Sequence, residues 1–510
     1  MNRRLWTFLV VGLCLVPSLA GVAQEAKTLI VGIEADVMTL DPGNHRDRTT
    51  QNVIRNMFDG LVTRTPAMEV VPELAVSWER ISDTEWVFHL RDGVTWHDGV
   101  PFTAEDVEFT VDRTVKEGRI GGRTSPRKSL LDPVIGAEVV DRLTVKIITA
   151  VPFPALLAFL PFHEIVPKHY VEAVGDAYFA ENPIGTGPFR FVRWDKGVQV
   201  VMERYDGYYG GSPDIPPVGP AKLDRVIFRV LPETSTRIAA LRAGEIHIAT
   251  RIPVDLIPEI EAGPNLLVMS VRGTRSTFLE MNVTQPPFDD VRVRRAMNYA
   301  IDVNKIIEHV LGGLATPIPS LLSPDSPYFK DLEPYGYDPE KAKALLAEAG
   351  YPHGFSVTID CEDYLKDVAL VCAQMLREIG IDARVQVWER GILRTKLLNR
   401  ERAMWIGDWG NATLDPMDIM IPKLRTGERG NYTGYSSCLY DGLMEFAERI
   451  ARDPTSRTAA YHIAQELIHH EAPMVFLYVA EELYGVSRRV IGWQPSPDSR
   501  INLHDVDLGQ

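Results

Sequence analysis

The sequence has little cysteine, only four residues in 510, and one of these, Cys14, lies in the apolar amino-terminal run. The other three are Cys361, Cys372 and Cys438, an odd number that leaves at least one thiol unpaired within a monomer. A disulfide framework is therefore not expected to hold this fold, since the chain is long enough to rely on hydrophobic cores.

Positive charge is also in short supply. The sequence has 54 lysines and arginines against 69 aspartates and glutamates, a formal net charge of -15. Binding to nucleic acid needs clustered basic residues that contact phosphates. We therefore expect no nucleic-acid partner.

Only one long hydrophobic run is present, and it lies at the amino terminus. Arg3 and Arg4 precede the apolar run Leu5 to Leu19, and small residues follow up to Ala23. This pattern is typical of a secretory signal peptide, which predicts cleavage after residues 1–23 and export. Because no later run approaches about twenty apolar residues, we expect no membrane span in the mature chain.

The motifs of several enzyme classes are missing. The sequence has no Gly-x-Ser-x-Gly elbow, no His-Glu-x-x-His helix and no Walker-type phosphate loop. His469 and His470 are adjacent, so on a helix they point about 100° apart and cannot share a metal on one face. We therefore expect neither catalysis nor a metal or other cofactor, and a secreted hydrolase stays a remote alternative.

Strand and helix patterns divide the chain. Residues 66 to 183 combine a strand-rich meander with one helix capped by Thr103, which predicts a small α+β unit. The segment Pro183 to Pro188 holds two glycines and two prolines in six residues, and we expect it to carry the chain into another unit.

The second half alternates helices and strands. Asp290 and Asp338 are predicted to cap two helices. Strand patterns at 355–359, 381–388 and 403–409, joined by helices, predict three parallel strands. Pro473 to Val479 is predicted to be a closing strand, followed by a separate one at Val486 to Val490.

Ligands of open α/β sheets settle where strands end. We therefore expect the stretch Trp405 to Pro416, which leaves a predicted buried strand, to contact a ligand. Glu34 to Asp36 follows an earlier strand in the same way. The loop from Arg425 to Tyr435 offers arginines, an asparagine and tyrosines suited to an acidic or polar ligand.

Several ordered segments carry a resemblance to a known family. They are Pro72-Glu73-Leu74-Ala75, Leu90-Arg91-Asp92-Gly93-Val94, Gly185-Thr186-Gly187-Pro188-Phe189, Pro287-Phe288-Asp289-Asp290-Val291-Arg292, Ala300-Ile301-Asp302, Tyr337-Asp338-Pro339-Glu340-Lys341-Ala342 and Glu471-Ala472-Pro473. Together they resemble the family 5 extracellular solute-binding proteins of bacterial ABC importers, the dipeptide, oligopeptide and nickel-binding group. The resemblance covers essentially the whole chain after the signal peptide.

The resemblance implies an α/β fold of the periplasmic-binding-protein type, with two lobes and a hinge. It implies a discontinuous domain I (27–65, 184–275 and 484–510), an inserted domain II (66–183) and a domain III (276–483). It also implies a periplasmic monomer that binds a peptide-class solute between its lobes and delivers it to the transmembrane permease subunits. A non-peptide solute, such as an opine-like compound, a sugar or a metal chelate, is the alternative.

One position departs from the family pattern. In peptide-binding relatives an aspartate three residues after the tryptophan equivalent to Trp409 holds the peptide's α-amino group, and here that position is Ala412. An alanine cannot accept a hydrogen bond from an ammonium group, so peptides with a free amino group are not expected unless Asp408, Asp415 or Glu34 supplies a carboxylate. The expected ligand contacts are Glu34, Asp36, Trp409, Asn411, Ala412, Asp415, Arg425, Arg429, Asn431 and Tyr432.

Overall fold

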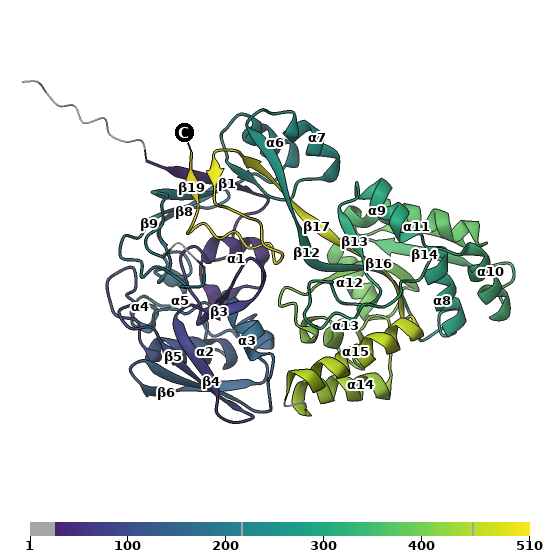
Figure 1. Cartoon of the computed structure of the whole chain (residues 1–510), viewed down its shortest axis with the longest axis horizontal. Helices are drawn as coiled ribbons and strands as arrows, with labels where there is room; N and C mark the ends of the chain where they lie inside the picture. The colour runs from purple at the N-terminus through teal and green to yellow at the C-terminus, as the bar shows by residue number, and fades with distance from the viewer. Residues whose placement is uncertain (1–25, 216–217, 451–452, 510) are drawn as a thin grey trace, which may run out of the picture.

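A computed structural model describes residues 26–215, 218–450 and 453–509. The predicted signal peptide, residues 1–23, lies outside the described residues. Figure 1 shows two lobes side by side, with two long strands passing from one to the other. We call the half that contains β1 to β11 the first lobe and the half that contains α8 to α15 the second lobe.

The main sheet has eleven strands and runs through both lobes in the order β15-β14-β16-β12-β17-β11-β1-β10-β9-β8, with β13 paired to β17. Its strands are β1 Thr28–Ile33, β8 Phe189–Asp195, β9 Gln199–Arg204, β10 Arg225–Val230, β11 Ile248–Ala249, β12 Leu266–Met281, β13 Ala315–Pro317, β14 Ser356–Cys361, β15 Asp382–Val387, β16 Met404–Gly410 and β17 Met474–Ser487.

The strands β12 and β17 form the connection between the lobes. They pair antiparallel from Leu266 opposite Ser487, near the core of the first lobe, to Glu280 opposite Met474, in the core of the second. The sequence predicted two separate strands near the end of the chain, which is wrong, because β17 is one continuous strand. This two-stranded ribbon therefore links the cores of the two lobes.

A four-stranded antiparallel sheet, in the order β4-β5-β7-β6, forms the far part of the first lobe. Its strands are β4 Ala75–Arg80, β5 Glu85–Leu90, β6 Val134–Asp141 and β7 Thr144–Thr149. The helix α2 (Ala104–Val115) packs on it through Val107 and Val111, and the Asp106 carboxylate accepts the Thr103 N–H at 3.0 Å, which fixes the start of the helix as predicted.

Short elements complete the first lobe. They are α1 Arg48–Ile54, β2 Val62–Arg64, β3 Val70–Pro72, α3 Leu156–Phe159, α4 Lys168–Val174, α5 Asp176–Phe179, α6 Thr234–Arg242, α7 Ile257–Glu261, β18 Val490–Ile491 and β19 Asp507–Leu508. The core around β1 includes residues from the two ends of the described chain, such as Leu29 and Leu503.

The segment Pro183 to Pro188 lies flat against the turn after α1. A Cβ on Gly185 would meet the Met57 carbonyl oxygen at 1.9 Å, so only glycine allows this approach. The half-buried His97 ring accepts the Gly185 N–H and bonds the Gly187 carbonyl, and burial lowers the pKa of His97 to about 4. The neutral ring therefore ties this crossing to the loop that follows β5.

Helices dominate the second lobe and cover its part of the main sheet (Figure 1). They are α8 Val291–Ala300, α9 Val303–Val310, α10 Pro339–Glu348, α11 Lys366–Glu378, α12 Arg390–Leu398, α13 Met420–Leu424, α14 Cys438–Glu445 and α15 Pro454–Glu471. As predicted, Asp290 and Asp338 cap α8 and α10 by accepting the N–H groups of Arg292 and Lys341. The strands β15, β14 and β16 are parallel, which confirms the predicted crossover pattern.

The three cysteines of the described chain are free thiols. Cys361 and Cys372 are buried, and Cys438 is exposed.

Within the described part of the chain, no helix is both long enough and apolar enough to cross a membrane.

Two buried carboxyl groups share one site in the first lobe. Glu73, from the Pro-Glu-Leu-Ala segment, accepts the Gly60 N–H at 2.6 Å, and Asp59 accepts the Thr186 hydroxyl at 2.9 Å. Burial raises the pKa of Glu73 to about 8, and the negative charge of Asp59 adds to this rise. Burial also raises the pKa of Asp59 to about 6.

Replacing Glu73 with glutamine is expected to remove a pH-dependent contribution to stability. A raised folded-state pKa means that the native protein holds the proton more tightly than the unfolded chain. The contribution of Glu73 is therefore full below pH 4.5 and is lost as the pH rises to about 8, by at most about 1.4 kcal/mol per pH unit. Urea unfolding of wild type and Glu73→Gln from pH 5 to pH 8 measures this. The difference between the two proteins should change steadily with pH, and a constant difference contradicts the assignment.

Candidate ligand-binding cleft

Two adjoining cavities lie where the lobes meet, with volumes of about 550 and 480 Å³. They share six residues, so they form one cleft. The shared residues, which come from both lobes and from the connecting strand β12, are Arg48, Arg251, Arg275, Arg390, Asp408 and Gly410. A cleft of this combined size accommodates a small organic solute or short peptide.

The larger of the two cavities, which we call the hinge cavity, lies against β12 and β17. Its lining is Ile33, Glu34, Arg48, Thr49, Asn52, Thr250, Arg251, Ile252, Pro253, Thr274, Arg275, Glu362, Tyr364, Arg390, Asp408, Gly410, Glu481, Glu482, Leu483, Tyr484 and Ser499. Five of these side chains are carboxylates and four are arginines, so both signs of charge are present.

The smaller cavity, which we call the basic cavity, has a lining with an excess of positively charged side chains. Its lining is Arg46, Asp47, Arg48, Gln51, Arg127, Leu130, Phe162, Arg251, Arg275, Arg390, Asp408, Trp409, Gly410, Ala412, Thr413, Asp418 and Arg429. Seven arginines therefore face three aspartates in this space.

Carboxylates within the cleft hold some of these arginines. Arg251 lies 2.9 Å from the Glu34 carboxylate, which also accepts the Thr49 and Thr250 hydroxyls. Although burial alone would raise the pKa of Glu34, the Arg251 charge and the hydrogen bonds lower it overall. Arg275 donates to Asp408 at 2.6 Å. These two pairs place a carboxylate of each lobe against an arginine in the cleft.

Four arginines of the basic cavity have no such partner. Three of the seven make ion pairs, at 2.6 to 3.8 Å. Among the residues that the structure describes, no carboxylate lies within ion-pair distance of the remaining set, which is Arg46, Arg48, Arg390 and Arg429. The first two belong to the first lobe, and the other two belong to the second.

The tryptophan at the end of β16 forms a wall of the basic cavity. The Trp409 indole N–H donates to the Asp418 carbonyl at 2.9 Å. The Arg429 guanidinium lies 5.2 Å from the ring centroid, and Gly430 packs so closely on the ring that an added Cβ would lie 2.6 Å from it. Trp409 is therefore held in place and in turn supports Arg429 by a cation–π contact.

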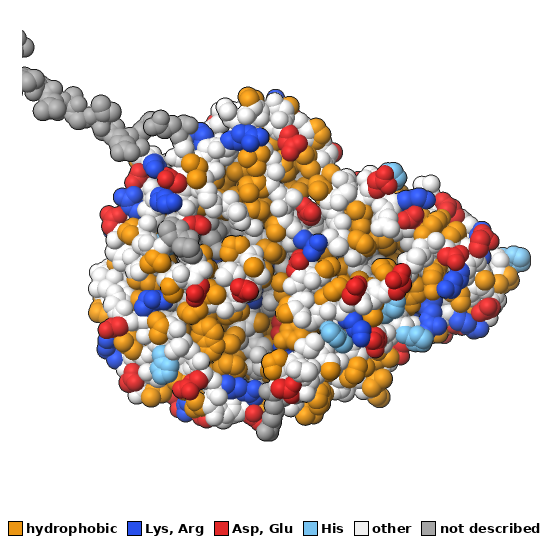
Figure 2. Space-filling model, viewed as in Figure 1, with side chains coloured by type: hydrophobic (Ala, Val, Ile, Leu, Met, Phe, Trp, Pro, Cys, Tyr) orange, Lys and Arg blue, Asp and Glu red, His pale blue; other side chains and the backbone are white. Residues whose placement is uncertain are grey.

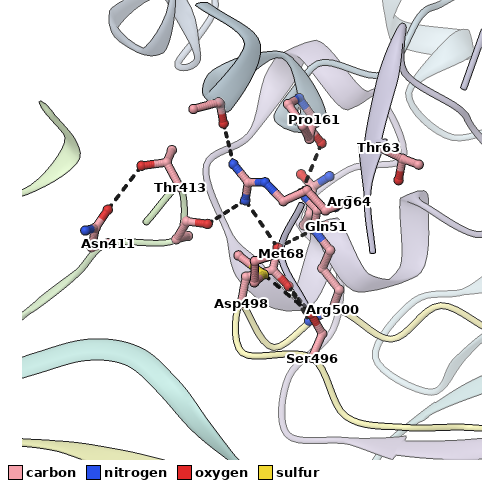
Figure 3. Close-up of polar contacts among 12 residues, drawn as sticks. Gln51, Thr63, Arg64, Met68, Pro161, Asn411, Thr413, Ser496, Asp498 and Arg500 are labelled. Carbon is pink, nitrogen blue, oxygen red and sulfur yellow. Dashed lines mark hydrogen bonds and ion pairs between the residues drawn. The ribbon is translucent and has the colours of Figure 1, made fainter. Parts of the chain in front are cut away.

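A hydrogen bond crosses from one lobe to the other beside this wall (Figure 3). The Arg64 guanidinium of β2 donates to the Ala412 carbonyl at 2.6 Å, and it also donates to Ala158 and pairs with Asp498 at 3.6 Å. Burial lowers the pKa of Arg64 to about 10, with Asp498 opposing that shift. The loop after β16 is thus attached to the first lobe through its backbone.

Four of the residues expected from the sequence line the cleft. Glu34 lies in the hinge cavity, and Trp409, Ala412 and Arg429 lie in the basic cavity. These side chains come from segments far apart in the sequence. The structure therefore brings together part of the predicted set.

Three others line neither cavity and have partners elsewhere. Asp36 accepts hydrogen bonds from the Trp194 indole at 3.0 Å and from the Gly197 N–H. Arg425 pairs with Glu445 at 3.3 Å. Tyr432 packs beside Trp405, with Lys423 at 5.7 Å from its ring centroid.

The last three are buried and hold the loops in shape. Asp415 pairs with Arg457 through two contacts of 2.8 Å. The Asn431 amide donates to three backbone carbonyls. Asn411 accepts the Thr413 hydroxyl, as Figure 3 shows. None of the three lines either cavity.

Several cleft residues were missed in the sequence. Arg48 and Arg390 begin helices, and Glu481 and Glu482 lie within β17. The only available signal was the acidic pair inside an otherwise apolar strand, since buried strands rarely carry adjacent charges without a functional reason. Among the described residues, no cluster of three or more His, Cys, Asp or Glu is arranged to hold a metal ion.

Comparisons with known proteins agree with this architecture. The model for bacterial extracellular solute-binding proteins, family 5 Middle, matches residues 69–431, and the chain belongs to this family. The glutathione-binding protein GsiB of Salmonella paratyphi A is 29% identical over 502 residues, which cover 95% of each chain.

Solved structures show the same fold. The ABC transporter-associated periplasmic binding protein DppA of Helicobacter pylori, in complex with the peptide STSA, is 28% identical, with a TM-score of 0.78 over 95% of this chain and 98% of that one. The ABC transporter substrate-binding protein CtaP of Listeria monocytogenes is 26% identical, with a TM-score of 0.86 over 96% and 100%. The chain is accordingly the solute-binding component of an ABC importer, and its task is binding rather than catalysis.

Proposed function

We propose that this protein binds a peptide-class solute in the cleft and delivers it to the permease subunits of its importer. The observation that carries this proposal is the cleft itself, which has two cavities of about 550 and 480 Å³ lined from both lobes. Relatives that bind a tripeptide or short peptides, according to their names, support the same class of solute.

Binding of the solute acts through closure of the two lobes. A ligand that contacts both lobes favours the closed state, and about 5.5 kcal/mol of preference shifts a 1:99 population to 99:1. Micromolar affinity corresponds to about 8 kcal/mol, which is sufficient. The permease then recognises the surface that closure creates.

The proposal keeps the organisation expected from the sequence. Domain I comprises 27–65, 184–275 and 484–510, domain II comprises 66–183, and domain III comprises 276–483. Separate hydrophobic cores around β1, around the small sheet and around α8 and α11 support this division. Residues 1–23 act as a cleaved signal peptide, and the mature protein works as a monomer in the periplasm.

A thermal-shift panel tests the solute class. A ligand at about 100 times its dissociation constant adds about 2.7 kcal/mol to stability, so a binding pool should raise the melting temperature. We expect a rise with di- and tripeptide pools, including glutathione, and peptides recovered intact by mass spectrometry. If peptides leave the melting temperature unchanged while an opine-like compound, a sugar or a metal chelate raises it, the peptide assignment fails. Cleaved peptides would favour the hydrolase alternative.

A further inference from the structure

We propose that the preferred solute is an anionic peptide whose carboxylates bind in the basic cavity, between arginines of the two lobes. This inference rests on the proposed function and narrows it to a charge class. It assigns Arg46, Arg48, Arg390 and Arg429 as the residues that recognise the carboxylates.

The basic cavity has an excess of positive charge, although the whole chain is negatively charged. The whole sequence carries a formal net charge of -15, yet this cavity gathers seven arginines around three aspartates. On the face shown in Figure 2, by contrast, basic and acidic side chains are interspersed. A local excess of one sign inside a concave site raises the local concentration of a solute of the opposite sign.

The four arginines without ion pairs are distributed over both walls. Arg46 and Arg48 stand at the start of α1, while Arg390 begins α12 and Arg429 rests on the Trp409 ring. Arg46 and Arg429 repel each other across the cleft: burial lowers the pKa of Arg46, and the charge of Arg429 on the opposite wall lowers it further, with Asp418 opposing that shift.

An anion between these walls turns repulsion into attraction. A guanidinium group presents a planar fork of N–H donors that matches a carboxylate, often through two parallel hydrogen bonds. A carboxylate held from both sides gains most when the lobes are closed. The ligand's own charge therefore supplies the preference for the closed state that transport requires.

The two parts of the cleft also assign a direction to the peptide. In the basic cavity Ala412 adds no carboxylate and seven arginines outnumber three aspartates, so an α-amino group is poorly placed there. The hinge cavity, however, contains Glu362, Glu481 and Glu482, which form no ion pair with any residue that the structure describes. We therefore place the amino end of the peptide in the hinge cavity and its acidic side chains or carboxyl terminus in the basic cavity.

A retention experiment tests the inference. Purified mature protein is mixed with an equimolar library of free tripeptides Ala-X-Y, in which X and Y are Ala, Leu, Gln, Lys or Glu. After rapid desalting, the retained peptides are released by denaturation and quantified by mass spectrometry. We expect Glu-containing peptides to be enriched at least about tenfold over their Gln counterparts, since arginine forms stronger hydrogen bonds with a carboxylate than with a neutral amide.

Matched variants locate the effect. Arg390→Gln and Arg429→Gln should each reduce the enrichment for Glu over Gln at least about threefold, whereas Arg394→Gln should leave it unchanged. Arg394 lies on the same helix as Arg390, is exposed and lines neither cavity. Melting temperatures without peptide show whether each variant is folded.

The outcomes separate this inference from the proposed function. Retained peptides with no preference for Glu, or with a preference for Lys, overturn the anionic class while peptide binding stands. Enrichment that persists equally in both cleft variants overturns the assigned residues. If no peptide of any charge is retained, the peptide function and this inference fail together.

Discussion

Replacing Asp415 with alanine is expected to lower the free energy of unfolding by about 3–5 kcal/mol. The Asp415 carboxylate makes two contacts of 2.8 Å with the Arg457 guanidinium, and the two side chains are only 4% and 6% exposed. Arg457 has no other carboxylate at ion-pair distance among the described residues, and only the hydroxyls of Tyr328 and Tyr461 would remain as partners. The variant therefore leaves an uncompensated charge inside the second lobe.

Urea unfolding monitored by tryptophan fluorescence measures this effect. The exposed pair of Asp382 and Arg384 offers a matched comparison, since Asp382→Ala should cost less than about 1 kcal/mol. The double variant Asp415→Ala/Arg457→Met should recover part of the lost free energy of unfolding, because it also removes the uncompensated charge of Arg457. A loss at Asp415 no larger than that at Asp382 contradicts a structural role for the pair.

Replacing Trp409 with alanine is expected to weaken binding of a retained tripeptide at least about tenfold, or about 1.4 kcal/mol. The indole forms a wall of the basic cavity, and its loss also removes the surface on which Arg429 rests at 5.2 Å. Aromatic residues in such positions often dominate binding energy. Isothermal titration calorimetry with the wild-type and variant proteins measures the change.

Trp388 provides the control for this variant. Its indole N–H donates to Asp360 at 2.6 Å, and Lys396 and Arg402 lie over its ring, yet it lines neither cavity. Trp388→Ala should therefore leave the affinity unchanged within about twofold. If Trp409→Ala binds as tightly as wild type, the ligand lies elsewhere.

Local signals in the sequence predicted much of the second lobe. Asp290 and Asp338 cap helices because a short side chain that accepts N–H groups is sufficient for that role, whatever the tertiary context. The strand β12 was not predicted, and β17 was divided in two. Glu481 and Glu482 break the apolar pattern of β17 where it passes the cleft. Because of these two cleft residues, the sequence pattern did not predict one continuous strand.

The site was less predictable, because its residues meet only in three dimensions. Trp409 was predicted because it lies at the end of a strand, and Arg429 because it lies in a loop rich in glycine, and both features are visible in a sequence. Asp415 has the same kind of local context, but its partner Arg457 lies on α15, and only that contact makes it structural. Arg390 looks like any exposed arginine at a helix start, and its place in the cleft depends on the packing of two lobes.

The most direct measurement is a crystal structure of the mature protein grown with a Glu-containing tripeptide. The account predicts closed lobes around the peptide, with its carboxylates between Arg46 or Arg48 on one wall and Arg390 or Arg429 on the other, and with its amino group near Glu481 and Glu482. A peptide that binds outside the cleft, or with its amino group against these arginines, would contradict it.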